Sequence, residues 1–158
     1  MAKKRWTLDK MPEQSGRIAL VTGANSGLGF YTSRALARKG AKVIMACRNL
    51  EKGEAARQSI VNDGVAAEPE LWQLDLASMG SVMQFTRRFK ASGMQVDLLI
   101  NNAGLMAIPY ARTAEGFEMQ FGVNHLGHFA LTALLCANRR RRSFVGSEHS
   151  AGIQSSQE

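Results

Sequence analysis

A glycine-rich turn between an apolar run and a helical pattern is the part of this sequence with the clearest chemistry. Gly23, Gly27 and Gly29 follow the run 17–21 almost directly. Glycine lets the backbone turn tightly and approach a pyrophosphate, and the first turn of a helix offers unpaired N–H groups to an anion. The spacing therefore predicts a site for the diphosphate of a dinucleotide. The other residues expected to line this turn are Asn25, Ser26 and Leu28.

An arginine at the end of the next predicted strand is the second candidate. Arg48 lies 19 residues after Gly29, where a carboxylate would bind the ribose 2′-hydroxyl of NAD, and no Asp or Glu occurs between Phe30 and Leu50. A guanidinium suits a 2′-phosphate because it donates parallel hydrogen bonds to phosphate oxygens. We therefore favour NADP over NAD as cofactor, with Asn49 beside the arginine. The alternative is that Arg48 is a solvated surface cation.

The elements that would position these residues alternate between strand and helix patterns. The sequence predicts strands at 18–21, 41–47, 70–74 and 96–100, and helices at 28–39, 50–61, 78–91 and 114–138. Continuous apolar strands separated by helices indicate parallel strands that are covered on both faces. With right-handed crossovers the strand order is 3-2-1-4. The expected fold class is α/β: a Rossmann-like, doubly wound parallel sheet whose later strands are missing.

Length and composition fit one globular domain. The 158 residues are 45% apolar and 21% charged, which argues against wholesale disorder. We expect a polar leader at 1–15, an incomplete dinucleotide-binding domain at 16–138, and a basic, then serine- and glutamine-rich tail at 139–158. Two cysteines are too few for a disulfide framework and favour a cytoplasmic protein.

The formal charge of +7 lies mostly at the two ends of the chain. Four basic residues occur in the first ten and four arginines form the run 139–142, whereas residues 11–138 contain 12 basic and 10 acidic side chains. Without a nucleic-acid module beside these ends, we predict no nucleic-acid partner. The uncharged stretch 119–138 contains Gln120, Asn124 and two histidines, and this polarity argues against a membrane span.

Four motifs together resemble the short-chain dehydrogenase/reductase family. They are Thr22-Gly23-x-x-x-Gly27-x-Gly29, Asp75 after the third predicted strand, Asn101-Asn102-Ala103-Gly104, and Asn124. The stretch 124–129 is similar to the branch that contains retinol dehydrogenases, WW-domain oxidoreductases and protochlorophyllide reductases. The resemblance covers about residues 16–136. It implies reversible hydride transfer between NADPH and an alcohol or carbonyl group, on a substrate that the motifs do not identify.

The resemblance also implies a role for each of the later motifs. Asp75, with Leu76 beside it, would accept a hydrogen bond from the adenine amino group, although an aspartate at a strand end can also cap the following turn. Asn124 would be the catalytic asparagine, which kinks the long helix and binds a water in the proton relay. The ribose side of the cofactor would contact Asn102, Ala103 and Gly104.

Two histidines and the long helix raise the question of further partners. His125 and His128 are three residues apart, a spacing that could meet a metal, but without a nearby cysteine or carboxylate we favour packing roles and no metal. The helix 114–138 resembles the one that the family uses for dimerisation. The resemblance therefore predicts a homodimer through this helix.

The proton donor of the family is missing from this sequence. In the family it is a tyrosine followed by a lysine four residues later, whereas Tyr31 and Tyr110 have alanine at that spacing and no lysine follows Lys90. Ser147 or Ser150 would stand near the place of the family's serine. We predict an inactive polypeptide from a truncated or frameshifted reading frame. The alternative is a catalytically dead module that binds a dinucleotide or dimerises.

Overall fold

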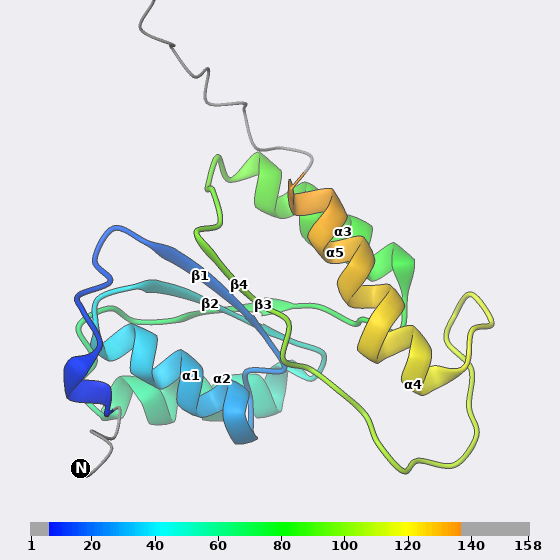
Figure 1. The fold of residues 1–158 in the computed structure, drawn as a ribbon, viewed down its shortest axis with the longest axis horizontal. Coiled ribbons are helices and arrows are strands. Elements are labelled where there is room, and N and C mark those ends of the chain that lie inside the picture. Colours follow the sequence, from blue (N-terminus) through cyan, green and yellow to red (C-terminus); the bar gives the residue numbers. More distant parts are fainter. Residues whose placement is uncertain (1–6, 137–158) are drawn as a thin grey trace, which may run out of the picture.

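The computed structural model describes residues 7–136 as one sheet of four parallel strands between two layers of helices (Figure 1). The strands are β1 (Ile18–Thr22), β2 (Lys42–Cys47), β3 (Glu70–Gln73) and β4 (Leu98–Ile100). The helices are the short η1 (Leu8–Lys10), α1 (Gly27–Arg38), α2 (Leu50–Asn62), α3 (Met79–Ala91), α4 (Met119–Phe121), the π-helical segment η2 (Gly122–Gly127) and α5 (His128–Cys136).

The strand order is β3-β2-β1-β4, and all three neighbouring pairs are parallel. Thr22 at the end of β1 is opposite Ala46 of β2, and Val21 is opposite Ile100 of β4, so the strands end at the same edge of the sheet. The predicted α/β fold and the order 3-2-1-4 are therefore confirmed. In such sheets the strand order reverses between β1 and β4, and ligands bind beyond the carboxyl ends of the strands at this switch point.

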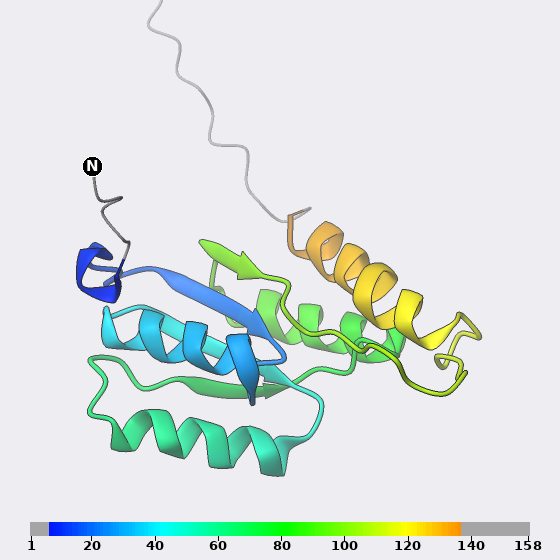
Figure 2. The ribbon, with the colours of Figure 1, turned by 60° about the horizontal axis from the view of Figure 1, so that its bottom comes forward.

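The two faces of the sheet carry separate apolar cores because side chains alternate along a strand. Leu20 and Ile44 belong to the core shared with α3 and α5. Val21 and Val43 belong to the core shared with α1 and α2. Figure 2 shows α1 and α2 on one side of the sheet and α3 with α5 on the other. Coverage on both faces explains why the two central strands β1 and β2 are apolar along most of their length.

The predicted helix 114–138 was wrong at its start. The helical segment begins at Met119, because the carboxylate of Glu118 accepts the backbone N–H of Gln120 at 2.9 Å and that of Phe121 at 2.8 Å. A negative charge at this position also suits the positive end of a helix dipole. Residues 113–117 instead form a turn, in which the N–H of Thr113 donates to the carbonyl of Phe117 at 2.8 Å. Residues 137 and 138 lie outside the described part of the chain.

The fourth strand begins two residues later than the predicted range 96–100. Asp97 precedes it and contacts the start of β1 twice. Its backbone N–H donates to the Ile18 carbonyl at 2.9 Å, and its Oδ2 accepts the Ile18 N–H at 2.8 Å. Among the described strands β4 pairs with β1 alone, so its other edge has no described neighbour.

The described part of the predicted leader packs on the domain. Met11 contacts the core beneath α1 and α2, and Gln14 is buried. The Gln14 N–H donates to the Lys39 carbonyl at 2.7 Å, and its Oε1 accepts from Arg17 at 3.2 Å. Residues 7–16 therefore contribute contacts to the end of α1 and the start of β1.

Candidate functional site

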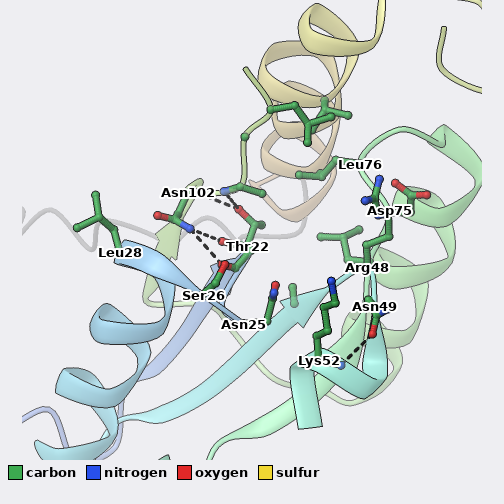
Figure 3. A pocket seen from close by; sticks show the side chains of 17 residues that line it. Thr22, Asn25, Ser26, Leu28, Arg48, Asn49, Lys52, Asp75, Leu76 and Asn102 are labelled. Atoms are coloured by element: carbon green, nitrogen blue, oxygen red, sulfur yellow. Dashed lines mark hydrogen bonds between the residues drawn. The ribbon is translucent and has the colours of Figure 1, made fainter. Parts of the chain in front are cut away.

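A hollow of about 530 Å³ lies at the carboxyl ends of the strands, and we refer to it as the strand-end pocket (Figure 3). Its walls come from the turn after β1, the ends of β2 and β3, the start of α2, the loop after β4 and η2. The lining residues are Thr22, Gly23, Asn25, Ser26, Leu28, Ala46, Arg48, Asn49, Lys52, Leu74, Asp75, Leu76, Asn102, Ala103, Gly104, Leu105 and Val123.

The glycine turn can form only because two of its positions have no side chain. A Cβ at Gly23, where φ is +63°, would lie 2.9 Å from the Cα of Ala103. A Cβ at Gly29 would lie 2.5 Å from the Gly23 carbonyl oxygen and would overlap the side-chain amide of Asn102. Gly29 and Gly27 do not line the pocket. Gly29 acts by letting α1 approach the loop after β4.

The first turn of α1 opens onto the pocket without a side-chain cap. Ser26 is the residue before the helix, and its side chain makes no capping hydrogen bond. The starts of α2 and α3, in contrast, are capped by the side chains of Asn49 and Ser78. The first N–H groups of a helix have no partner within the helix. Those of α1 are therefore free to bind an anion at the positive end of the helix dipole.

Two cationic side chains, Arg48 and Lys52, line the same pocket. Both residues are exposed, and within residues 7–136 neither side chain has a hydrogen bond or an ion pair. Asn49 lies between them, and its Oδ1 accepts the Lys52 N–H at 2.8 Å (Figure 3). This cap fixes the start of α2 and brings Lys52 one helical turn after Arg48. Two unpaired cations at one mouth of a pocket suit a phosphate group.

Asp75 lines the pocket and also caps the turn after β3. Its Oδ1 accepts the Ala77 N–H at 2.9 Å, and its own N–H donates to the Ser81 hydroxyl at 2.9 Å. The turn-capping alternative is therefore present in the structure. The contact with adenine stays a prediction, and it would fall to the second carboxylate oxygen. Leu76 lies beside it in the lining and packs closely against Gly127.

The buried hydroxyl of Thr22 joins β1 to the loop after β4. Thr22 Oγ1 accepts the Asn102 N–H at 2.9 Å and the Ala103 N–H at 3.0 Å. The Asn102 side-chain Nδ2 donates to the Thr22 carbonyl at 2.9 Å (Figure 3). The predicted residues Asn102, Ala103 and Gly104 all line the pocket. Their positions depend on a residue that lies 80 positions earlier in the chain.

Asn124 lies outside the pocket lining, in the π-helical segment η2. Its Oδ1 accepts the Leu105 N–H at 2.8 Å, and its Nδ2 donates to the Leu105 carbonyl at 2.8 Å. Single π-helical turns are frequent at functional sites because they alter the direction of nearby side chains. Asn124 thus fixes the loop after β4 at Leu105, two residues beyond the segment that Thr22 fixes. Its catalytic role stays a prediction.

Two buried titratable groups lie close to the pocket. Burial lowers the pKa of His128, an effect that the Asn124 carbonyl partly opposes. Burial raises the pKa of the Cys47 thiol, although the backbone of Ala24 and Asn25 contacts it and acts in the opposite direction. Both groups are therefore neutral near pH 7.

The described residues contain neither a candidate metal site nor a helix that could span a membrane. No group of three or more His, Cys, Asp or Glu side chains in residues 7–136 could bind a metal ion. No helix in the same part of the chain is both long and apolar enough to cross a bilayer. Ser147 and Ser150 lie outside the described residues.

The pocket brings together most of the predicted site residues and adds some that the sequence analysis missed. Gly27, Gly29 and Asn124 are the predicted residues that do not line it. The lining residues that were not predicted as site residues are Thr22, Ala46, Lys52, Leu74, Leu105 and Val123. Lys52 could have been found, because it stands four residues after Arg48 at the start of a predicted helix. The apolar residues Ala46, Leu74, Leu105 and Val123 belong to or pack against the core, and nothing in the sequence around them indicates a binding site.

Comparison with known proteins agrees with this geometry. A family model described as short chain dehydrogenase matches residues 17–144. Mouse (Mus musculus) retinol dehydrogenase 12 is 48% identical over 120 residues, which are 76% of this chain and 38% of that protein. A solved protein from Mycobacterium Paratuberculosis is 50% identical, with a TM-score of 0.73 over 84% of this chain and 46% of that one. A metagenomic short-chain oxidoreductase in complex with NADP is 28% identical, with a TM-score of 0.67 over 78% of this chain and 56% of that one.

The chain thus spans well under half of the length of this retinol dehydrogenase relative. The match to the family model, over residues 17–144, nevertheless includes all the residues that line the strand-end pocket. The strand order, the glycine turn and the family match agree with one another. The chain belongs to the short-chain dehydrogenase family.

Proposed function

We propose that this chain binds NADP(H) in the strand-end pocket and forms the cofactor-binding half of an oxidoreductase for an alcohol or carbonyl group. One observation carries the proposal: the uncapped start of α1 and the side chains of Arg48 and Lys52, which have no partner among residues 7–136, line a single hollow. NADP carries a pyrophosphate and a separate 2′-phosphate. The pocket offers the amides at the start of α1 to the pyrophosphate and the two cations to the 2′-phosphate.

The residues present fit this cofactor. The amides at the start of α1 would bind the pyrophosphate, and Gly23 would let the backbone approach it. The second oxygen of Asp75 would accept from the adenine amino group, and the loop at Asn102 would contact the ribose beside the nicotinamide. Bound NADPH supplies a hydride to a carbonyl group. The chain's own residues bind and orient it.

The preference for NADP over NAD rests on charge. Arg48 and Lys52 are cations at the end of β2 and the first turn of α2, where NAD-binding members of this fold class carry a carboxylate. No Asp or Glu lines this end of the pocket, among the residues described, apart from Asp75 after β3. The NADP complex of the metagenomic relative supports the same choice. Lys52 thereby joins Arg48 as a second candidate for the 2′-phosphate.

The 158-residue polypeptide is proposed to bind the coenzyme without turning over a substrate. Tyr31 is 57% exposed on α1 and Tyr110 is 72% exposed in the loop after β4, and neither lines the pocket. Neither has a lysine four residues later. Without a proton donor beside the carbonyl, hydride transfer is slowed severely. The name of retinol dehydrogenase 12 supports an alcohol as the substrate of the full-length relatives.

A coenzyme titration tests the proposal. Purified protein is titrated with NADPH and with NADH, and binding is followed by the fluorescence of the reduced nicotinamide. We expect saturable binding with a preference for NADPH, and no turnover over a panel of carbonyl compounds. A folded sample that ignores both coenzymes at millimolar concentration would overturn the proposal. Measurable turnover would overturn only the proposal that the polypeptide is inactive, and would leave the binding proposal standing.

Charge reversal tests the preference. Arg48→Asp should shift binding toward NADH, and Lys52→Glu should weaken NADPH binding with little effect on NADH. Arg87→Asp is the matched control, because Arg87 is an exposed arginine on α3 and does not line the pocket. An Arg48→Asp protein with the wild-type preference would refute the role of the arginine.

We further propose that a second copy of this chain covers the outer face of η2 and α5. Phe121, the last residue of α4, is 53% exposed, and Phe129 of α5 is 68% exposed. Exposed aromatic side chains on one helical segment are typical of protein–protein contacts. The family resemblance of this helix to a dimerisation helix supports a homodimer.

A further inference from the structure

His128 is a buried polar residue that the proposed binding function does not use. It lies at the start of α5, is 6% exposed, and does not line the strand-end pocket. Its Nε2 is 2.9 Å from the Thr22 hydroxyl, and its Nδ1 is 3.2 Å from the Asn124 carbonyl. His128 thus contacts both residues that fix the loop after β4.

The hydrogen bonds around Thr22 determine which ring nitrogen of His128 carries the proton. A hydroxyl has one proton and two lone pairs. The backbone N–H groups of Asn102 and Ala103 already donate to the two lone pairs, at 2.9 Å and 3.0 Å. The Thr22 hydroxyl must then donate, and the Nε2 at 2.9 Å is closer than the Ile100 carbonyl at 3.4 Å. Nε2 therefore accepts, and the ring proton sits on Nδ1, where it donates to the Asn124 carbonyl.

We propose that His128, as the neutral Nδ1–H tautomer, is a positioning residue that orients the Thr22 hydroxyl so that its oxygen accepts from the amides of Asn102 and Ala103. Protonation of His128 then loosens the loop after β4 and weakens coenzyme binding. The consequence for binding rests on the proposed NADP(H) function. The effect on the loop does not.

Protonation creates a conflict at the Thr22 oxygen. An imidazolium donates from both nitrogens, so Nε2–H would become a third donor to an oxygen with two lone pairs. The hydroxyl proton would have to turn to Ile100, and one of the three donors would lose its acceptor. A buried donor without a partner is costly, and the loop amides are the donors that can move away.

Among residues 7–136, the elements around His128 bring no carboxylate to its ring that would offset this conflict. β1, β4, the loop 101–105 and α5 have no Asp, Glu, Lys or Arg. Asp97 precedes β4, and η2 contributes His125, which stacks on Phe121. α3, which packs on α5, carries only the cations Arg87, Arg88 and Lys90. Burial accordingly lowers the pKa of His128, so the neutral form is present at pH 7.

The first test uses the full chain without nucleotide. Nitrogen-15 NMR of the histidine rings should show an unprotonated Nε2 and a protonated Nδ1 for His128 at pH 7.5. A protonated Nε2 would overturn the inference. Amide hydrogen exchange gives a second readout. In His128→Phe, which has no acceptor, exchange at Asn102 and Ala103 should be about tenfold faster, a difference of about 1.4 kcal/mol.

The second test compares variants across pH. His128→Gln retains an acceptor but does not titrate, and His125→Phe is the control on the same helical segment. Loop exchange and the dissociation constant of NADP⁺ are measured from pH 7.5 to pH 5. Between pH 7.5 and pH 5, the wild type and the His125→Phe control should show faster amide exchange in the loop and several-fold weaker NADP⁺ binding. Both changes should be larger than those seen in His128→Gln. The titration of NADP⁺ itself is common to all three proteins and cancels in this comparison.

The outcomes separate this inference from the proposed function. Unchanged loop exchange in a folded His128→Phe protein, or the same pH dependence in His128→Gln as in the wild type, would overturn the inference. If no NADP⁺ binds, the exchange and NMR results still decide the role of His128, and the failure falls on the proposed function. If His128→Phe does not fold, the wild-type NMR and His128→Gln decide.

Discussion

Replacing Thr22 with valine removes one hydroxyl from the centre of the site and leaves its shape nearly unchanged. Thr22 is fully buried at the end of β1. Its oxygen is the acceptor for the backbone N–H groups of Asn102 and Ala103. The variant therefore tests whether the loop after β4 is fixed by that single atom. Thr22→Ser is the matched control, because it retains the hydroxyl and loses a methyl group.

The size of the effect follows from the donors that would lose their acceptor. A buried N–H without a partner costs about 1–3 kcal/mol. Asn102 and Ala103 are both half-buried, so water can replace part of what is lost. For the two amides together we expect the free energy of unfolding to fall by about 2–4 kcal/mol in Thr22→Val. Thr22→Ser should lose about 1 kcal/mol, the value of one buried methyl group.

Urea unfolding of the three proteins measures the difference, and a coenzyme titration measures its effect on binding. Thr22→Val should unfold at a clearly lower urea concentration than Thr22→Ser, and it should bind NADPH more weakly. Equal stability of the two variants would refute the reasoning. It would show that water satisfies the loop amides as well as the hydroxyl does.

Three further predictions concern packing, pH and assembly. Gly29→Ala should lower the free energy of unfolding by about 1–3 kcal/mol, because its methyl group overlaps the Gly23 carbonyl. Gly80→Ala is the control, since the first turn of α3 has room for a methyl group and the stability should not change. Thermal unfolding of the two variants measures the difference. The wild type should lose stability as pH falls below about 6.5, the pKa of an unperturbed histidine. The pKa of His128 is lowered in the folded state, so its contribution to the free energy of unfolding is present only while the ring is neutral. An unfolding midpoint that rises between pH 7 and pH 5 would contradict this. Phe129→Glu should dissociate the proposed dimer in sedimentation velocity while leaving the far-ultraviolet spectrum unchanged, and a wild-type monomer at high concentration would remove the basis for the dimer.

The sheet could be predicted because its signals are local. Apolar runs flanked by glycine and polar turns indicate buried parallel strands, and chirality of the crossovers leaves few possible orders. The glycine turn was predicted for the same reason, since Gly23 and Gly29 are close in sequence as well as in space. The predicted NADP preference came from Arg48 and from the absence of Asp and Glu between Phe30 and Leu50. Lys52 fits the same proposal, and the signal for it was its position one turn after Arg48.

The start of the last helical segment could not be predicted from periodicity. Apolar residues recur at helical spacing from 117 onward, but the Glu118 carboxylate caps the helix and Gly116 adopts a φ of +87° just before it. Contacts between distant segments were also invisible in the sequence. Thr22 and His128 are 106 residues apart, and nothing in either local sequence indicates that they share a hydrogen bond. The cytoplasmic location stays a prediction.

Coenzyme binding and proton donation use different parts of a short-chain dehydrogenase. Every residue that lines the strand-end pocket lies between Thr22 and Val123, so the groups that we propose for coenzyme binding are present in this chain as a set. The tyrosine and lysine pair of the family is absent from the sequence. Because binding energy does not depend on the proton donor, the first set can act without the second. A measurement of NADP(H) affinity therefore tests the proposed binding site, whereas a measurement of turnover tests for the missing proton donor.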